Sequence, residues 1–412
     1  MMHVILSEGL EDKAFIQERT EGLAALAEMV RGYTPERVAE ITGIAPDDLR
    51  AAARLYAQAE SAALVYAMGI TQHTCGTDNV LSCANLAMLT GNVGKPSSGV
   101  NPLRGQNNVQ GACDMGGLPN VYSGYQAVSS NEARQRFVAA WGQAPGLQAG
   151  RTIGRMFEGA LEGHVRAMFI MGENPLVSDP DINAVKQALG ALEFLAVSEI
   201  FMSETAELAD VVLPAASWLE KSGTFTATDR RVQPIRQAIP PRGDARPDWW
   251  IVAELARRLT HALGRHSDAP YAGWDYVGPE EILREAAALT PSYGGITPER
   301  LSAAGFLQWP CPSAEHPGTP YLHKGRFARG LGAFTPVEYR PAAELTDEDY
   351  PFILSTGRSL FHFHTGTMTR RTAKLEQEVP ENYVEIHPAD AERLGVGKSG
   401  WVRVSSRRGS LE

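Results

Sequence analysis

The sequence has few cysteines and no long apolar run. The 412 residues include only Cys75, Cys83, Cys113 and Cys311, and none has the CxxC spacing or partner histidines of a zinc or iron–sulfur site. This pattern favours reduced thiols in the cytosol. No stretch approaches the ~20 apolar residues of a membrane span, and the first fifteen residues lack the basic start and apolar run of a signal peptide. We therefore expect a cytoplasmic protein without a membrane span.

Positive charge is also scarce, because the formal net charge is −10 and the pI is about 5.6. This balance argues against nucleic acid as a partner, which would need a basic face. The cluster of Arg230, Arg231 and Arg236 is short and typical of a solvated face or a local anion contact. An anionic substrate would thus be attracted by local residues. The length predicts about two to three domains.

One stretch of the sequence is rich in residues that can bind a ligand. Residues 101–117 read NPLRGQNNVQGACDMGG and hold four glycines, five side-chain amides and one arginine, with no regular apolar spacing. We expect a loop that binds a ligand, because glycines let backbone N–H groups approach it and amides supply donors and acceptors. Arg104 adds a planar fork of donors suited to a carboxylate or phosphate. The alternative is an ordinary polar surface loop.

The region before this loop has an α/β pattern. Residues 11–60 predict helices, one of them starting at Thr34, Pro35 and Glu36. Residues 62–68 predict a buried parallel strand, followed by a loop to residue 77 and a helix over 78–89. Ligands bind at the carboxyl ends of such strands. Gln72 and His73 are therefore either ligand contacts or a solvated pair.

A second α/β pattern spans residues 165–215. It predicts strands over 165–172, 193–200 and 209–215, with a helix over 182–192 and a short helix over 203–208. The first turn, GENP, lacks GxGxxG, so a nicotinamide cofactor is not indicated. Glu199 ends the second strand, where it could accept hydrogen bonds from ribose or guanine. A purely structural acid is the simpler interpretation of Glu199 on its own.

The remaining chain is less informative. A helix is expected from about Pro247, and residues 265–345 are loop-rich and contain a domain boundary. Residues 351–358 predict a strand and turn, and the end of the chain predicts the strand, helix and strand of a small β-barrel-like domain. His362 and His364 would project to one side of an extended segment, but a third metal ligand is lacking. A polar loop reaching a cofactor is therefore favoured over a metal site.

Several of these segments are similar to one family. Residues 69–100, the run NNVQGACDMG, MGENPLVSD (171–179), and residues 200–226 and 354–369 closely resemble the catalytic, or alpha, subunit of molybdenum or tungsten formate dehydrogenases. These belong to the bis-pterin molybdenum oxidoreductases. The resemblance covers nearly the whole chain, and NNVQGACDMG is specific to the formate branch.

The resemblance implies an architecture and a cofactor. The fold class would be α/β, with parallel-sheet domains of the molybdopterin oxidoreductase type followed by the start of a small β-barrel-like domain. Residues 1–106 would be part of one pterin-binding α/β domain, 107–217 a second, 218–345 a connecting region and 346–412 the incomplete last domain. The cofactor would be a molybdenum or tungsten bis-molybdopterin guanine dinucleotide.

The resemblance also implies roles for individual residues. Arg104 would lie beside the metal and orient formate by a bidentate pair, with Gly105 and Gln106 contacting the pterin and Met68 and Gln72 near one dinucleotide. The second α/β domain would bind dinucleotide through Gly172, Glu173, Asn174, Ser178, Ser198, Glu199, Ser203 and Ala215. The last domain would face the pterin through Thr356, Arg358, His362, His364 and Thr365.

The family's metal ligand, a cysteine or selenocysteine followed by histidine, and its iron–sulfur domain match no part of these 412 residues. The resemblance therefore implies a fragment of a formate-oxidising subunit that is inactive alone. Iron–sulfur or flavin subunits would be its electron-transfer partners. Two alternatives stay open: a non-catalytic cofactor-binding or scaffold module, as in the large iron–sulfur subunit of respiratory complex I, and an oxidoreductase acting on another small oxyanion.

Overall fold

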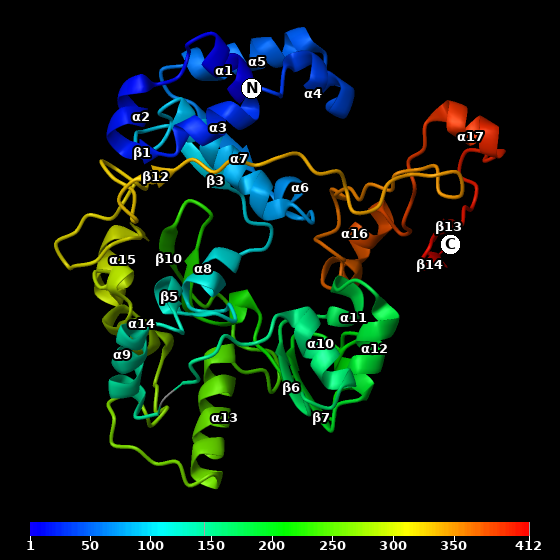
Figure 1. Ribbon diagram of the computed structural model, residues 1–412. Helices are drawn as coiled ribbons and strands as arrows, with labels where there is room; N and C mark the ends of the chain where they lie inside the picture. The colour runs from blue at the N-terminus through cyan, green and yellow to red at the C-terminus, as the bar shows by residue number, and fades with distance from the viewer. Residues whose placement is uncertain (144, 412) are drawn as a thin grey trace. The chain divides into compact units, whose positions relative to one another are not determined.

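The computed structural model describes residues 1–143 and 145–411. The chain forms two compact units, each assembled from two separate stretches of sequence. The first unit contains Met1–Thr152 and Ala215–Ala342, and the second contains Ile153–Pro214 and Ala343–Glu412. Figure 1 shows the elements of each unit in chain order.

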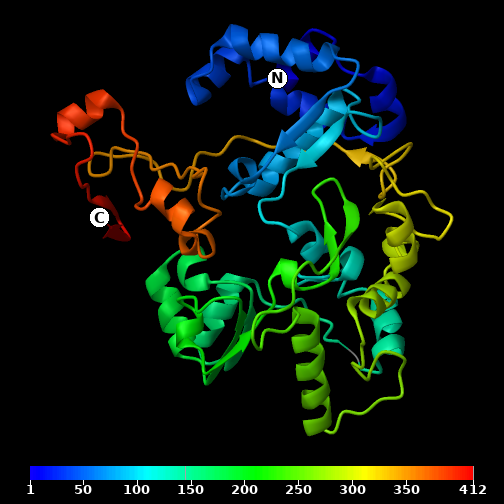
Figure 2. The same cartoon turned by 180° about the vertical axis from the view of Figure 1, so that it is seen from behind.

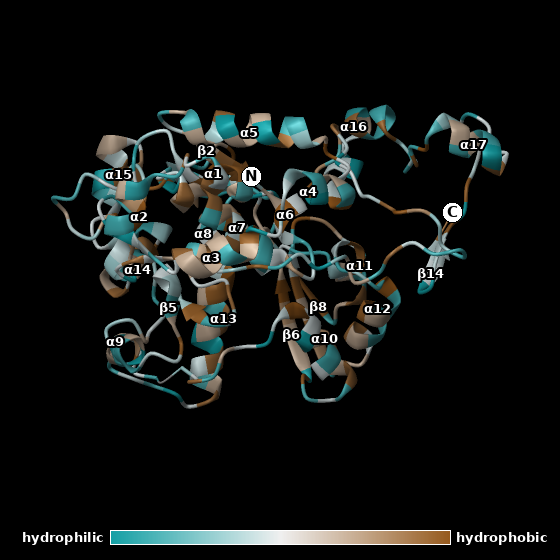
Figure 3. Cartoon of the chain, turned by 45° about the horizontal axis from the view of Figure 1, so that its top comes forward, coloured by the Kyte–Doolittle hydropathy of each residue, from teal (hydrophilic) through white to brown (hydrophobic). Residues whose placement is uncertain are grey.

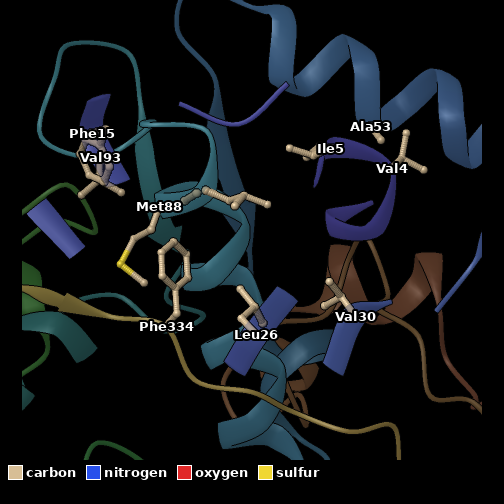
Figure 4. Packing of buried hydrophobic residues seen from close by; sticks show 11 residues of the cluster. Val4, Ile5, Phe15, Leu26, Val30, Ala53, Met88, Val93 and Phe334 are labelled. Carbon is tan, nitrogen blue, oxygen red and sulfur yellow. The ribbon is translucent and has the colours of Figure 1, made fainter. Parts of the chain in front are cut away.

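The helices predicted over residues 11–60 are confirmed. They are α2 (Lys13–Arg19), α3 (Leu23–Val30), α4 (Pro35–Thr42) and α5 (Pro46–Gln58), and a further helix that was not predicted, α1 (Met2–Ser7), precedes them. Thr34 caps α4, because its hydroxyl accepts a hydrogen bond from the Arg37 N–H at 3.3 Å. Ile5, Leu26 and Leu89 are fully buried in the core cluster beside these helices, part of which Figure 4 shows. Apolar burial of this kind stabilises the otherwise marginal short helices.

The predicted parallel strand is β2 (Ala63–Tyr66), which pairs in parallel with β3 (Gly99–Pro102). Two helices connect them, α6 (Met68–Thr71) and α7 (Gly76–Leu89). The expectation that this strand is buried was wrong, because Val65 is 57% exposed. Among the described residues β2 has a single partner strand, and its alternate side chains face away from the protein interior.

The expectation of a loop throughout residues 101–117 also needs correction, because Val109–Asp114 form helix α8. Asn108 precedes the helix with a left-handed φ of 61°, and its side-chain oxygen accepts a hydrogen bond from the Thr226 N–H at 2.9 Å. The Gln110 amide donates to Asp114 at 2.7 Å, one turn further on. Polar tertiary contacts stabilise this helix, so apolar periodicity could not reveal it.

The rest of the first unit is a helical and antiparallel region. Its three-stranded sheet has the order β11 (Leu307–Gln308), β10 (Arg231–Ile235) and β9 (Gly223–Thr226). Val232, Tyr293 and Ile296 are buried beside it. The helices are α9 (Asn131–Trp141), α13 (Asp248–Ala262), α14 (Pro279–Leu289) and α15 (Pro298–Ala304), and the short strands are β1 (Thr20–Glu21) with β12 (Gly332–Ala333) and β4 (Val121–Tyr122) with β5 (Gln126–Ala127).

The second unit contains the predicted βαβαβ arrangement, which is confirmed. Strands β6 (Ala167–Met171), β7 (Phe194–Glu199) and β8 (Val211–Pro214) form one parallel sheet in that order. The helices are α10 (Ile153–Leu161), α11 (Pro175–Ser178) and α12 (Ile182–Gly190), with a 3-10 turn at Ala206–Leu208. Figures 2 and 3 show this sheet with its helices and its apolar strands. Val185, Leu195 and Val197 are buried between sheet and helix.

The last part of the second unit has little regular structure. It contains α16 (Ala373–Glu378), α17 (Pro388–Leu394) and a hairpin of β13 (Val404–Ser406) and β14 (Gly409–Leu411). Residues 351–358, predicted as strand and turn, form no strand, because no described segment pairs with them. The described residues form no closed barrel. The domain ranges expected from the sequence stay predictions.

Candidate functional site

In the first unit, the candidate residues follow the carboxyl ends of β2 and β3. Met68 begins α6 directly after β2, and Arg104 follows the end of β3 by two residues. The Leu103 N–H donates to the Tyr66 carbonyl at 2.7 Å, which continues the pairing to this edge. Gln72 and Gln106 are exposed and Gly105 is half-buried. Because the strands are parallel, both loops leave the same edge of the sheet.

Arg104 offers an available pair of donors at this edge. Its backbone N–H donates to Thr228 Oγ1 at 3.4 Å, and its Nε donates to Gln110 Oε1 at 3.0 Å. Within residues 1–143 and 145–411, neither terminal nitrogen of the guanidinium has a hydrogen-bond or ion-pair partner, and the residue is exposed. The end of the guanidinium can therefore bind a carboxylate with two parallel N–H···O bonds.

A buried carboxylate lies behind Arg104. Asp114 has no exposed surface and accepts hydrogen bonds from Gln110 Nε2 at 2.7 Å, Tyr125 Oη at 2.9 Å and Tyr293 Oη at 2.8 Å. Burial, together with the nearby Asp114, raises the pKa of both Tyr125 and Tyr293 above the usual value. Sequence reasoning missed Gln110 and Asp114, although their i, i+4 spacing was a signal.

In the second unit, further candidates lie at the carboxyl ends of β6 and β7. Gly172 follows β6 with a φ of +64°, and its N–H donates to the Ser198 carbonyl at 2.9 Å. Ser198 is fully buried near the end of β7, and its hydroxyl has no hydrogen-bond partner among the described residues. A buried unpartnered hydroxyl carries a free-energy cost that a ligand can remove. Glu199 ends the strand, with a carboxylate oxygen accepting from the Ile200 N–H at 2.7 Å.

Two sequence profiles match this chain. The sequence profile described as "Molybdopterin oxidoreductase" matches residues 1–258, and the one described as "Molydopterin dinucleotide binding domain" matches residues 352–412. The chain belongs to the molybdopterin oxidoreductase family. Together the two matches support a molybdopterin cofactor with molybdenum or tungsten.

Relatives of this chain include two proteins named as formate dehydrogenases. The chain is 50% identical to "F420-dependent formate dehydrogenase 2 subunit alpha" of Methanococcus maripaludis over 99% of this chain and 59% of that protein. It is 44% identical to "Formate dehydrogenase H" of Escherichia coli over 100% of this chain and 57% of that protein. The chain thus spans less than two thirds of these relatives. The resemblance noted in the sequence is confirmed.

A solved structure supports the fold. "Acetylene Hydratase from Pelobacter acetylenicus" matches with a TM-score of 0.72 and 20% identity, covering 100% of this chain and 59% of that one. At this identity the match confirms the α/β fold class of the molybdopterin oxidoreductases and nothing about the reaction. Among the described residues no helix is long and apolar enough to cross a membrane.

The donor set of the second unit fits the nucleotide end of a molybdopterin cofactor. Ser178 Oγ donates to Glu173 Oε1 and to Asp179 Oδ2, each at 3.3 Å. Burial raises the pKa of Glu173, and the nearby charge of Asp179 raises it further. Burial also raises the pKa of Asp179. Glu173 is exposed and Asp179 is half-buried, and neither has an ion-pair partner among the described residues. Such carboxylates favour ligand groups that donate N–H or O–H, such as a base or a ribose. Ser198 adds its unpartnered hydroxyl.

The side chains of Asn174 and Ser203 form hydrogen bonds to other residues of the second unit. Asn174 is 5% exposed; its oxygen accepts from Thr205 N–H at 3.1 Å and Thr205 Oγ1 at 2.8 Å, and its nitrogen donates to Glu204 Oε2 at 2.8 Å and Thr367 Oγ1 at 3.0 Å. Ser203 Oγ accepts from the Ala206 N–H at 3.3 Å. The residues predicted to bind dinucleotide thus include some that shape the loop instead of facing outward.

The remaining candidates are dispersed. Ala215 is buried in the first unit, in a parallel bridge with Arg246. Among the candidates at residues 356–365, the exposed ones are Thr356, Arg358, His364 and Thr365. His362 is engaged at both ring nitrogens, Nδ1 with Thr369 Oγ1 at 3.1 Å and Nε2 with the Val379 carbonyl at 2.8 Å. The described residues contain no group of three or more His, Cys, Asp or Glu placed to hold a metal ion.

Proposed function

We propose that this chain is part of an enzyme that oxidises formate to carbon dioxide, and that Arg104 binds the substrate. The observation that carries the proposal is the end of the Arg104 guanidinium, which has no partner among the described residues at the carboxyl edge of β2 and β3. Identities of 44% and 50% to proteins named as formate dehydrogenases support it.

Arg104 pairs with both oxygens of formate through its two terminal nitrogens. This pairing neutralises the carboxylate and leaves the C–H group pointing away from the arginine. Oxidation releases carbon dioxide, one proton and two electrons. A molybdenum or tungsten centre held by two pterin guanine dinucleotides supplies the acceptor for those electrons.

The second unit holds one dinucleotide in this proposal. Glu173 and Asp179 accept hydrogen bonds from guanine or ribose, and the buried Ser198 hydroxyl gains a partner. Gly172 lets the backbone turn closely around the ligand, since its positive φ suits glycine. Binding of the dinucleotide is also proposed for Asn174, Ser178, Glu199 and Ser203 of this unit and for Ala215 of the first unit. Thr356, Arg358, His362, His364 and Thr365 face the pterin in the same proposal.

Met68, Gln72, Gly105 and Gln106 complete the proposed cofactor contacts in the first unit. The four cysteines here lack cluster spacing, so iron–sulfur or flavin groups outside these residues would accept the electrons. A cytoplasmic location stays a prediction from the sequence.

The proposal is tested with the assembled enzyme that contains this chain. Purified from a molybdenum-competent host, it should release guanine on acid treatment and reduce an artificial electron acceptor when formate is added. Faster turnover of another small oxyanion than of formate would contradict formate as the substrate. Absence of both guanine and turnover would favour the non-catalytic scaffold instead.

A further inference from the structure

A buried polar chain connects Arg104 to the interior of the first unit. The Arg104 Nε donates to Gln110 Oε1 at 3.0 Å, and the Gln110 Nε2 donates to Asp114 Oδ1 at 2.7 Å. Gln110 is 7% exposed and Asp114 has no exposed surface. The amide thus links an exposed cation to a buried anion by direct hydrogen bonds.

The hydrogen bond to Asp114 fixes the orientation of the Gln110 amide. Asp114 can only accept hydrogen bonds while ionised, so it requires the NH2 end of Gln110. Tyr125 Oη, 3.2 Å from Gln110 Nε2, and Tyr293 Oη supply further hydrogen bonds. The carbonyl end of Gln110 must then face Arg104, where it accepts from Nε.

This geometry has a consequence for Arg104. A guanidinium can bind a carboxylate side-on through Nε and one terminal nitrogen, or end-on through both terminal nitrogens. Gln110 already occupies Nε, so only the end-on fork is left for a ligand. The backbone bond from Arg104 N to Thr228 Oγ1 at 3.4 Å restrains the residue at its other end.

We propose that Gln110 is a positioning residue that, anchored by Asp114, holds Arg104 so that it presents its end-on fork to the substrate. The inference rests on the proposed function, since it takes formate as that substrate. Gln110, a residue of α8, would thus act on the substrate through Arg104 without contacting the substrate itself. Substitution of Gln110 should therefore change both KM and kcat, because the fork contacts formate before and during the reaction.

The informative substitution is Gln110→Glu. The new carboxyl would lie beside Asp114, so one carboxyl of the pair keeps its proton to a higher pH than usual. While protonated, Glu can donate to Asp114 and accept from Arg104 as the amide does. When it ionises at higher pH, it repels Asp114 and pairs with the Arg104 guanidinium, which removes the fork from the substrate.

Other charged or titratable groups lie near residues 110 and 114. In the part of the chain that the structure describes, they include Arg104, Tyr125 and Tyr293, the partly buried Arg230, Cys113 near Tyr125, and Tyr66 near Arg104. All of them are present in both the wild type and the variant. A difference between the two pH profiles therefore reports residue 110.

The test compares kcat/KM for formate against pH in the holoenzyme. Gln110→Leu should lower it about 10–100-fold at every pH, and Gln110→Glu should approach wild-type values at low pH and fall as pH rises. The exposed Gln148 gives matched controls, Gln148→Leu and Gln148→Glu, which should leave the profile unchanged.

Thermal unfolding of each variant separates positioning from stability. If Gln110→Leu does not fold, the pH profile of Gln110→Glu still decides the question, because only a positioning role predicts near wild-type kcat/KM at low pH and a loss as pH rises. A Gln110→Glu profile parallel to the wild type would overturn the positioning role while leaving formate oxidation intact. A wild-type enzyme that does not oxidise formate would instead overturn the proposed function, and with it this inference.

Discussion

The two parallel sheets carry opposite chemistry at their carboxyl edges. After β3, the first unit presents the exposed cation Arg104, whereas after β6 the second unit presents the carboxylates of Glu173 and Asp179. A cationic edge suits a small anion, and an acidic edge suits neutral groups that donate hydrogen bonds. In the proposed function, the edge after β3 binds the substrate and the edge after β6 binds the nucleotide.

The largest expected effect comes from removing the cation. Arg104→Ala should lower kcat/KM for formate about 10³-fold, because the bidentate charge pair is lost. Arg104→Lys keeps the charge but not the fork, so we expect most of that loss to remain. Steady-state kinetics at equal cofactor content measures both. Full activity of the lysine variant would show that charge alone attracts the substrate.

In the second unit, Asn174→Ala should act on stability. It removes four internal hydrogen bonds and leaves the buried Thr205 N–H without its acceptor, while Thr205 Oγ1 keeps only the bond it accepts from the Leu176 N–H. We expect unfolding free energy to fall by about 2–3 kcal/mol. Chemical denaturation measures it, with exposed Asn183→Ala as the control. An equal, small effect of both substitutions would contradict a structural role for Asn174.

Ser198→Ala distinguishes a ligand contact from a packing residue. The hydroxyl has no partner among the described residues, so its removal should change the stability of the cofactor-free protein by less than about 1 kcal/mol. The bound guanine per mole of protein should fall, because the dinucleotide loses a contact. Unchanged guanine content would remove Ser198 from the cofactor site.

The smallest effect concerns acid stability. The pKa of Glu204 is lowered to about 2, through its backbone hydrogen bond and then through Asn174 and Arg370. A lowered carboxyl pKa contributes stability that is present above the ordinary value near 4.5 and is lost as pH falls toward 2. Arg370→Gln should remove about 0.5–1 kcal/mol at neutral pH, since the pair is partly exposed. Thermal unfolding between pH 2 and about 6 should then vary less with pH than in the wild type.

Much of the fold could be predicted from the sequence. The strands β6, β7 and β8 alternate with helical segments, and Thr34 with Pro35 marks the start of α4, so local pattern and tertiary structure agree. Helix α8 could not be found in this way, because Asn108, Gln110 and Asp114 stabilise it through contacts with distant residues. The strand expected at 351–358 fails for the same reason, since strand formation depends on a partner.

The candidate site was predictable in part. Arg104 was identified from its amide-rich surroundings, but its orientation depends on Asp114, Tyr125 and Tyr293, which lie up to 189 residues away along the chain. Ser198 and Asn174 both lie in the α/β pattern predicted over residues 165–215. In the structure, the buried Ser198 hydroxyl has no hydrogen-bond partner among the described residues, whereas the buried Asn174 amide is hydrogen-bonded at both its oxygen and its nitrogen. Composition alone cannot separate these two outcomes.

The most direct test of the central claim is protection of Arg104 by formate. Phenylglyoxal modifies accessible guanidinium groups, and mass spectrometry can follow Arg104 and the exposed Arg151 separately in the assembled enzyme. If Arg104 binds the substrate, saturating formate should slow labelling of Arg104 and leave Arg151 unchanged. Equal labelling of Arg104 with and without formate would contradict the account.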